Sequence, residues 1–363
     1  MKYLLMIHAL SIGGAERVGV SWANGLKKLG HDIDILTDTE VPITYTVNRG
    51  INIISQYKSK YKNRIFKRVD NIYQRTKQLI TLTRKNNYDI IIKVLPEEFL
   101  PIIITKIITH IPVILTDHNS YERPKCAPMS KSQWFDKFIL NRFYDIVTVL
   151  TSPDKDILSR AGLRNVEVLH NPLFLKPSSK ENENKIVLAV GRIDAWHYKG
   201  FDILIKAWNK VWEKHSDWKL KIVGMGEQSN IDFLYSLADD RRSVEILPYT
   251  SDIVSYYREA SIYCLSSRYE GWGLVLVEAM SQGCASVACD YKGRQAEIIR
   301  DGLNGILCPT ENATALSCKI QSLIEDDSLR RNLQFNAPKY LDELSEINVA
   351  KRLEMISIRI VKV

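Results

Sequence analysis

Short apolar runs followed by helical patterns recur along this chain. Tyr3 to His8 is a compact apolar run, and from Ala15 to Leu29 apolar residues return at steps of three and four until Gly30. This pattern predicts a strand, a turn at Gly13-Gly14 and a helix. Strands alternating with helices predict an α/β protein with a parallel, doubly wound sheet. Further strand-length apolar runs lie at residues 31–37, 88–94, 112–116 and 145–150.

A second series of the same kind follows Pro172. Residues 176–185 are Pro, Ser, Glu, Asn and Lys, with almost nothing to bury, as in an exposed linker. Strands are then predicted at residues 186–190, 220–223, 244–247, 262–265 and 285–288. We therefore expect an N-terminal Rossmann-like domain over 1–172, a linker over 173–185, a C-terminal Rossmann-like domain over 186–342, and a helix over 343–363 that crosses back to the N-terminal domain.

Composition bounds the class of protein. A chain of 363 residues is longer than one hydrophobic core usually organises, which agrees with two domains. The six cysteines form no C-x-x-C pair, and the apolar start leads into Gly13-Gly14 without a cleavage site. The apolar stretch 101–115 is broken by Lys106, His110 and Pro112 and is too short to span a bilayer. We expect a cytoplasmic protein with reduced cysteines and no transmembrane helix.

The net charge of +8 belongs to the first half of the chain. Residues 1–172 hold 25 Lys and Arg against 16 Asp and Glu, whereas the remainder holds 25 against 26. A basic half next to a nearly neutral one suggests an anionic partner, either a membrane surface, a phosphate-bearing acceptor or nucleic acid.

Much of this basicity is concentrated between residues 58 and 77, which contain one acid, Asp70. Apolar residues step by three and four from Ile65 to Leu79, so a helix here would carry an apolar stripe beside a basic face. One interpretation is that this face meets an anionic membrane or an acceptor phosphate; the other is that the stripe packs on its own sheet. The candidate cations are Lys58, Lys60, Lys62, Arg64, Lys67 and Arg68.

Several candidate binding residues come directly after predicted strands, where open α/β sheets bind ligands. Gly13 and Gly14 open a helix, where free amides and the helix dipole favour an anion. Arg192 and Lys199 follow the first strand of the second half and can neutralise a diphosphate. Gly224 belongs to a Gly-x-Gly turn whose third fingerprint glycine is replaced by serine, so it predicts a tight turn and not a nicotinamide site.

The strongest constellation is the stretch 266–280. A strand ends at Leu265, a glycine-rich loop carries Glu270, and an apolar helix beginning near Leu274 carries Glu278. The two carboxylates can therefore reach one ligand, while backbone amides of Gly273, Leu274 and Val275 bind its phosphate.

This stretch resembles glycosyltransferase family 4, whose mark is a pair of glutamates with seven residues between them. The resemblance extends through nearly the whole chain and implies the GT-B fold, in which two facing Rossmann-like domains hold the active site in the cleft between them. Its other motifs are Gly13-Gly14-Ala15-Glu16-Arg17, His118, Asn171-Pro172, Gly191-Arg192, Lys199-Gly200, Gly224-x-Gly226, Gly293 to Glu297 and Asp301-Gly302-x-Asn304-Gly305.

The resemblance implies a role for each matching residue. Glu270 and His118 would lie at the transferred sugar, Glu278 would hold the ribose hydroxyls, and Arg192 with Lys199 would neutralise the diphosphate. Family members retain anomeric configuration, and neither catalytic residue is expected to be a covalent nucleophile. We expect no metal and no cofactor, because the Asp-x-Asp at Asp32 and Asp34 alternates with isoleucines inside a predicted strand.

The implied partners are a nucleotide-sugar donor, for which UDP is favoured, and a glycan or polyprenyl-diphosphate-linked acceptor in polysaccharide, lipopolysaccharide or lipid-linked glycan assembly. The implied location is the inner face of the cell membrane, at its anionic surface. Two alternatives remain: another nucleotide-sugar enzyme on the same architecture, such as an epimerase, and a basic membrane- or nucleic-acid-binding scaffold. Nucleic acid is not expected as a partner, because no aromatic-rich RNA-binding signature is present.

Overall fold

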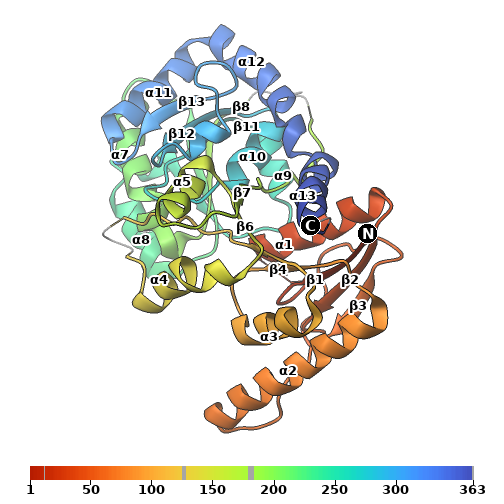
Figure 1. Ribbon diagram of the computed structural model, residues 1–363. Helices are drawn as coiled ribbons and strands as arrows, with labels where there is room; N and C mark the ends of the chain where they lie inside the picture. Colours follow the sequence, from red (N-terminus) through yellow and green to blue (C-terminus); the bar gives the residue numbers. More distant parts are fainter. Residues whose placement is uncertain (12, 125–127, 179–183, 362–363) are drawn as a thin grey trace. The chain divides into compact units, whose positions relative to one another are not determined.

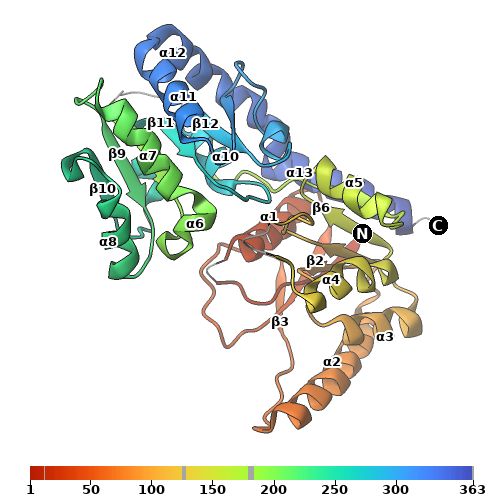
Figure 2. The same ribbon diagram turned by 90° about the vertical axis from the view of Figure 1, so that its left-hand side faces the viewer.

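The chain divides into two compact units, each built on one parallel sheet (Figures 1 and 2). A computed structural model describes residues 1–11, 13–124, 128–178 and 184–361. Unit 1 comprises Met1–Pro172 together with Leu344–Val363, and unit 2 comprises Leu173–Glu343. Residues 179–183 of the predicted linker lie outside the described residues.

Unit 1 contains seven parallel strands in the order β3-β2-β1-β4-β5-β6-β7. The central strands are continuous runs of apolar residues because helices cover both of their faces, and Leu4, Ile91 and Leu115 are fully buried there. The strands are β1 (Lys2–Met6), β2 (Asp32–Thr37), β3 (Asn52–Ser55), β4 (Ile90–Val94), β5 (Val113–Thr116), β6 (Ile146–Val149) and β7 (Val166–Val168).

The helices of unit 1 connect these strands and cover the sheet. The longest, α2, is capped by Asn63, whose side chain accepts hydrogen bonds from the amides of Ile65 and Phe66. The set is α1 (Gly14–Lys28), α2 (Arg64–Asn86), α3 (Phe99–Thr109), α4 (Lys131–Phe138), the 3-10 helix η1 (Leu140–Phe143), α5 (Ser152–Arg160) and α13 (Glu346–Val361).

Unit 2 repeats the plan with six parallel strands in the order β10-β9-β8-β11-β12-β13. Its strands are β8 (Asn184–Val190), β9 (Lys219–Val223), β10 (Val244–Leu247), β11 (Ala260–Leu265), β12 (Ala285–Asp290) and β13 (Ile306–Pro309). Its helices are α6 (Trp196–Lys199), α7 (Phe201–Trp212), α8 (Gln228–Ser236), α9 (Ile253–Glu259), α10 (Leu274–Ser281), α11 (Ala313–Glu325) and α12 (Asp327–Asn336), with 3-10 turns η2 (Ile193–Ala195), η3 (Arg241–Ser243), η4 (Gln295–Glu297) and η5 (Ala337–Leu344).

Every strand predicted from the sequence is present, and the prediction of doubly wound parallel sheets is confirmed. Three further strands, β3, β7 and β13, were not predicted. All three lie at the edge of a sheet. In both units the strand order reverses beside the first strand, between β1 and β4 and between β8 and β11, and we call these positions the switch points.

Helix α13 returns to unit 1 and packs against α1. Gly25 permits the close approach, because a Cβ there would lie 2.6 Å from Cβ of Ala350 and 2.9 Å from the carbonyl oxygen of Glu346. Polar contacts border the seam: Nζ of Lys28 lies 2.7 Å from Oε1 of Glu346. The small side chains at this contact, Gly25 and Ala350, therefore set how closely α1 and α13 pack.

Replacement of Gly25 by alanine is expected to destabilise the protein by about 1–2 kcal/mol. Alanine favours helix by up to about 1 kcal/mol, but crowding against α13 costs about 1–3 kcal/mol. Urea denaturation of the full chain measures the change in the free energy of unfolding. The cost should shrink in an Ala350→Gly background, and an unchanged cost there would contradict the proposed contact.

Candidate functional site

The loops after β8 and β11 leave the sheet of unit 2 side by side at its switch point. Ligands of open α/β sheets bind outside the carboxyl ends of strands at such positions. The loop after β8 carries Gly191 and Arg192 and leads through η2 and α6 to Lys199. The loop after β11 carries Glu270. The topology therefore brings together two motifs that are separated by about 70 residues of sequence.

Lys199 and Glu270 form an ion pair across these two loops. Nζ of Lys199 lies 2.7 Å from Oε2 of Glu270, and both side chains are half-buried. The Ser267 hydroxyl lies 3.4 Å from the same carboxylate oxygen, and the Ser266 hydroxyl donates to the carbonyl of Lys199 at 2.8 Å. The pair is therefore held by its own loops and presents both a positive and a negative group at the carboxyl end of the sheet.

Arg268 ties the same loops together a little farther along. Its guanidinium donates to both oxygens of Asp202 at 2.6 and 2.7 Å, and to the carbonyl of His197 at 2.7 Å. Burial raises the pKa of Asp202, but the hydrogen bond and charge of Arg268 outweigh it and leave that pKa below its usual value. Asp202 lies in the first turn of α7, so this bidentate pair joins the loop after β11 to that helix.

Glycines allow the loops of unit 2 to meet backbone to backbone. Gly200 has a φ of 65°, and a Cβ there would collide with the carbonyl of Ser266. Gly224 follows β9, and a Cβ there would collide with the carbonyl of Gly191. The Gly-x-Gly motif therefore has a steric reason, close contact with the loop after β8, which agrees with the predicted tight turn.

Glu278 lies in the second turn of α10 and is 7% exposed. The Tyr257 hydroxyl donates to Oε2 of Glu278 at 3.1 Å. Burial, and then the charge of Glu278, raise the pKa of Tyr257 well above its usual value, so the phenol stays protonated and keeps donating. The sequence did not indicate Tyr257, because this tyrosine lies 21 residues before Glu278 and belongs to no motif.

The first turn of α10 offers backbone amides for an anion. Gly273, the N-cap, has a φ of 109° and makes no side-chain cap, and Leu274 and Val275 are half-buried. Arg192 is exposed on the neighbouring loop. The structure thus places five groups beyond the carboxyl ends of β8 and β11: Arg192, Lys199, Glu270, Gly273 and the first turn of α10.

Gly13 and Gly14 lie at the start of α1 in unit 1. The Tyr45 hydroxyl lies 2.9 Å from both the nitrogen and the carbonyl oxygen of Gly13. The Glu16 carboxylate folds back over Gly13. An anion at this helix terminus therefore requires Glu16 to turn away, a condition that the sequence did not indicate.

His118 follows β5 and is held on both ring nitrogens. Nδ1 lies 3.1 Å from Oδ1 of Asn171, and Nε2 lies 3.3 Å from Oγ1 of Thr116. The indole of Trp22 lies against the ring at 5.5 Å between centroids. Burial lowers the pKa of His118 to about 4, while the charge of Asp117 acts in the opposite direction. The imidazole is therefore neutral at physiological pH and can hydrogen-bond a hydroxyl without adding a charge.

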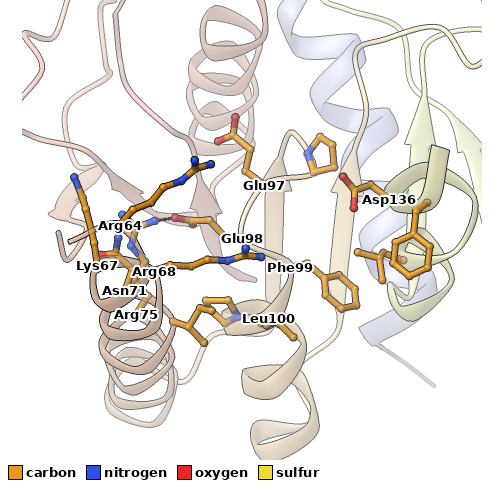
Figure 3. A pocket seen from close by; sticks show the side chains of 15 residues that line it. Arg64, Lys67, Arg68, Asn71, Arg75, Glu97, Glu98, Phe99, Leu100 and Asp136 are labelled. Atoms are coloured by element: carbon orange, nitrogen blue, oxygen red, sulfur yellow. Dashed lines mark ion pairs between the residues drawn. The ribbon is translucent and has the colours of Figure 1, made fainter. Parts of the chain in front are cut away.

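The six candidate cations of the basic segment of unit 1 lie in different surroundings. Lys58 forms ion pairs with Asp38 and Glu40, the second at 2.9 Å, and so contacts the segment that follows β2. Arg64, Lys67 and Arg68 line a cavity of about 900 Å³ between α2, α3, α4 and the loop after β4 (Figure 3). Lys60 borders a second cavity beside β3, and Lys62 is exposed before α2.

The apolar stripe of the same segment is divided as well. Leu79 is buried against the sheet, whereas Ile65 and Val69 are 72% and 60% exposed. The packing interpretation therefore holds for the second half of α2 and is wrong for the first half.

Asp34, the inner residue of the Asp-x-Asp pair, is engaged in β2. It accepts hydrogen bonds from the Tyr88 hydroxyl and, at 2.9 Å, from the Asn52 side chain. Its carboxylate is 4% exposed. Asp32 is exposed beside Lys27, but Asp34 is buried together with Ile33 and Ile35, so the predicted alternation of burial is wrong at Asp34, whose carboxylate is instead compensated by hydrogen bonds within unit 1.

Two family models match the chain and together span most of it. Residues 12–175 match the model described as Glycosyltransferase Family 4, and residues 172–340 match Glycosyl transferases group 1. An uncharacterized glycosyltransferase of Haemophilus influenzae is 31% identical over 323 residues, which cover 88% of this chain and 89% of the relative.

Two further comparisons extend this likeness. The GalNAc-alpha-(1->4)-GalNAc-alpha-(1->3)-diNAcBac-PP-undecaprenol alpha-1,4-N-acetyl-D-galactosaminyltransferase of Campylobacter jejuni is 26% identical over 346 residues, 93% of this chain and 92% of the relative. The crystal structure of HepE of Anabaena in complex with UDP and glucose matches with a TM-score of 0.75 at 18% identity, and covers 98% of both chains. This structural likeness shows the fold, and the predicted GT-B fold with two Rossmann-like units is confirmed.

His118 should remain neutral to an unusually low pH. Its folded pKa of about 4 lies below the value of about 6.5 in an unfolded chain. The unfolded state therefore binds more protons between these values, and this residue's contribution to stability is lost as the pH falls from about 6.5 to about 4. In an NMR titration the His118 ring should keep its neutral shifts at pH 5.5, and a midpoint near 6.5 would contradict the burial argument.

Proposed function

Because the chain belongs to glycosyltransferase family 4, we propose that it transfers a hexose or N-acetylhexosamine from a nucleotide-diphosphate sugar to a glycan or lipid-linked acceptor. The observation that carries the proposal is the ion pair between Lys199 and Glu270 at the switch point of unit 2. It combines a cation suited to phosphate with a carboxylate suited to sugar hydroxyls on the two loops where such a sheet binds its ligand.

The donor is proposed to bind along the loops of unit 2. Buried Glu278, oriented by Tyr257, accepts hydrogen bonds from the ribose hydroxyls. Arg192, Lys199 and the amides of Gly273, Leu274 and Val275 neutralise the diphosphate, and the Gly224 turn supports the loop beneath Arg192. UDP is the proposed nucleotide, and the complex of the structural relative HepE with UDP and glucose supports this choice. Gly13 and Gly14 are proposed to present backbone to the phosphates once Glu16 turns away.

Catalysis is proposed to retain the anomeric configuration without a covalent enzyme intermediate. The acceptor hydroxyl attacks the anomeric carbon from the face on which the diphosphate leaves, and the departing phosphate oxygen takes the hydroxyl's proton. Lys199 stabilises the negative charge that develops on that oxygen. Glu270 and neutral His118 hold hydroxyls of the sugar, and Asn171 orients the His118 ring.

The acceptor is proposed to bind unit 1, which carries the positive net charge. The Campylobacter relative is named for an undecaprenol-diphosphate-linked acceptor, which supports a lipid-linked glycan here and a role in cell-surface polysaccharide biosynthesis. Among the described residues no helix has the length and apolarity needed to cross a bilayer. Because a lipid-linked acceptor is anchored in the membrane, we place the enzyme, as part of this proposal, at the inner face of the cell membrane as a peripheral protein.

Two matched glutamate variants test the donor assignment. Glu278→Gln should weaken UDP binding about 10- to 100-fold, because hydrogen bonds to a charged group contribute about 1.5–3 kcal/mol. Glu270→Gln should reduce turnover far more than UDP affinity, since its proposed partner is the sugar. Calorimetry with UDP and a donor-turnover assay separate the two effects.

Exposed Glu213 in the same unit provides the control, and Glu213→Gln should match wild type in both assays. Equal UDP affinity in wild type and Glu278→Gln would refute the ribose assignment. Absence of sugar transfer from every nucleotide donor tested, with any acceptor, would overturn the proposed function itself.

Turnover is expected to survive excess EDTA. Arg192, Lys199 and the amides at the start of α10 supply the positive charge that Mg²⁺ provides in other transferases. An assay with and without chelator measures this directly. Activity that disappears with EDTA and returns with Mg²⁺ or Mn²⁺ would show that the side chains alone do not neutralise the leaving group.

A further inference from the structure

His118 lies in a turn that buried polar side chains hold from three other elements of unit 1. Residues 117–121, Asp-His-Asn-Ser-Tyr, follow β5, and we call them the post-β5 turn. Helix α4, the 3-10 helix η1 and helix α5 each contribute one polar side chain that contacts this turn and is at most 4% exposed. These side chains are Lys137, Asn141 and Asp154. Since charged side chains are seldom buried without a partner, their burial indicates a specific role.

Lys137 contacts the post-β5 turn on both sides of His118. Its Nζ lies 2.5 Å from Oδ2 of Asp117, the residue before the histidine, and 3.4 Å from the carbonyl oxygen of Asn119, the residue after it. The same ammonium lies 3.9 Å from the centre of the Tyr121 ring, a cation–π contact. The amide of Asn119 donates to Oδ1 of Asp117 at 2.9 Å and closes the turn. One buried cation therefore fixes the backbone on either side of the imidazole.

Asp154 and Asn141 hold the end of the turn independently of Lys137. Asp154 accepts hydrogen bonds from the Tyr121 amide at 2.8 Å and from the Ser120 hydroxyl at 3.2 Å. The side chain of Asn141 donates to the Tyr121 hydroxyl at 3.0 Å. The turn therefore keeps these anchors when Lys137 is replaced, and the effect of that replacement on the neighbouring histidine can be measured.

Two buried charges act on the imidazole of His118 in opposite directions. Burial has the largest effect and lowers the pKa of His118, while the charge of Asp117 raises it and the charge of Lys137 lowers it. Burial also raises the pKa of Asp117, but the charge and hydrogen bond of Lys137 outweigh this effect and hold that pKa below its usual value. The Tyr121 phenol stays protonated, because burial raises its pKa well above the usual value, and Asp154 contacts the far end of the turn. Lys137 is therefore the cation that compensates the carboxylate beside His118.

The neutral state of His118 decides which hydrogen bonds the ring can make. Oδ1 of Asn171 can only accept, so Nδ1 carries the proton in the 3.1 Å contact between them. In the neutral ring, Nε2 then keeps a lone pair that accepts a hydrogen bond from a hydroxyl. An imidazolium has lost that lone pair and only donates. Protonation would therefore remove the acceptor from this position.

We propose that Lys137 is a positioning residue for His118, which it keeps oriented and uncharged by neutralising Asp117 and by holding the turn on both sides. This inference rests on the proposed function, in which neutral His118 holds a hydroxyl of the transferred sugar. It adds a residue of α4 that touches neither donor nor acceptor and acts through the histidine alone.

Titration of the full chain by NMR, without any donor, tests the proposal. Lys137→Met should raise the pKa of His118 by about one unit, because an uncompensated carboxylate beside an imidazole favours the protonated ring. Lys137→Arg keeps the charge and should leave the pKa at about 4. Asp117→Asn/Lys137→Met removes both charges and should return the pKa to the wild-type value or below it, since the burial of the ring remains. A purely structural lysine would not produce this return.

Turnover gives a second measurement. Lys137→Met should reduce kcat about 10- to 100-fold, because a small displacement of a positioned group has a cost of this size. UDP affinity should stay as in wild type, since the proposed nucleotide contacts lie in unit 2. The loss should deepen as the pH falls toward the raised pKa of His118, and Lys137→Arg should recover most of the rate. Lys131→Met, which replaces an exposed lysine in the first turn of the same helix, is the control and should match wild type.

Circular dichroism and the dispersion of the amide signals show whether each variant is folded. Lys137→Gln, which keeps a side-chain donor without the charge, makes the same comparison if Lys137→Met does not fold. An unchanged pKa of His118 in the folded single variant would overturn the proposal, as would a raised pKa that persists in Asp117→Asn/Lys137→Met. Because the titration needs no donor, an absence of sugar transfer would count against the proposed function and leave the measured effect of Lys137 on His118 as it is.

Discussion

The candidate site depends on contact between loop backbones at the switch point of unit 2. Gly200 meets the carbonyl of Ser266, and Gly224 meets the carbonyl of Gly191, at distances that leave no room for a side chain. These contacts fix the loop after β8 against its neighbours on both sides. Lys199 therefore reaches Glu270 from a loop that backbone contacts hold in place, and in the proposed function its charge is positioned before the phosphates of the donor bind.

The sequence predicts the interior of both sheets well and their edges poorly. Central strands are covered on both faces, so they appear in the sequence as short, continuous apolar runs, and this pattern is easy to recognise. The missed strands β3, β7 and β13 are three of the four edge strands, and β3 (Asn52–Ser55) contains two polar residues and is largely exposed. Their pairing comes from the neighbouring strand's free backbone groups, and a sequence pattern does not record this.

The same distinction holds for the site. Residues within one motif, such as Glu270 and Glu278, could be grouped from their spacing alone. The Arg268–Asp202 clamp and the Tyr257–Glu278 bond join residues 66 and 21 positions apart, so they follow from topology and could not be foreseen. The exposure of the first turns of α2, residues 64–69, was one of two interpretations that the sequence left open, because the same period of apolar residues continues into the half of the helix that packs.

The return of α13 to unit 1 has a consequence for the order in which the protein is made. A ribosome completes the strands of unit 1 and then all of unit 2 before it releases α13 (Glu346–Val361). During that interval the face of α1 around Gly25 is uncovered, because α13, whose Ala350 later packs against Gly25, has not yet emerged. A nascent chain stalled at this stage should therefore expose an apolar helix face to which chaperones can bind.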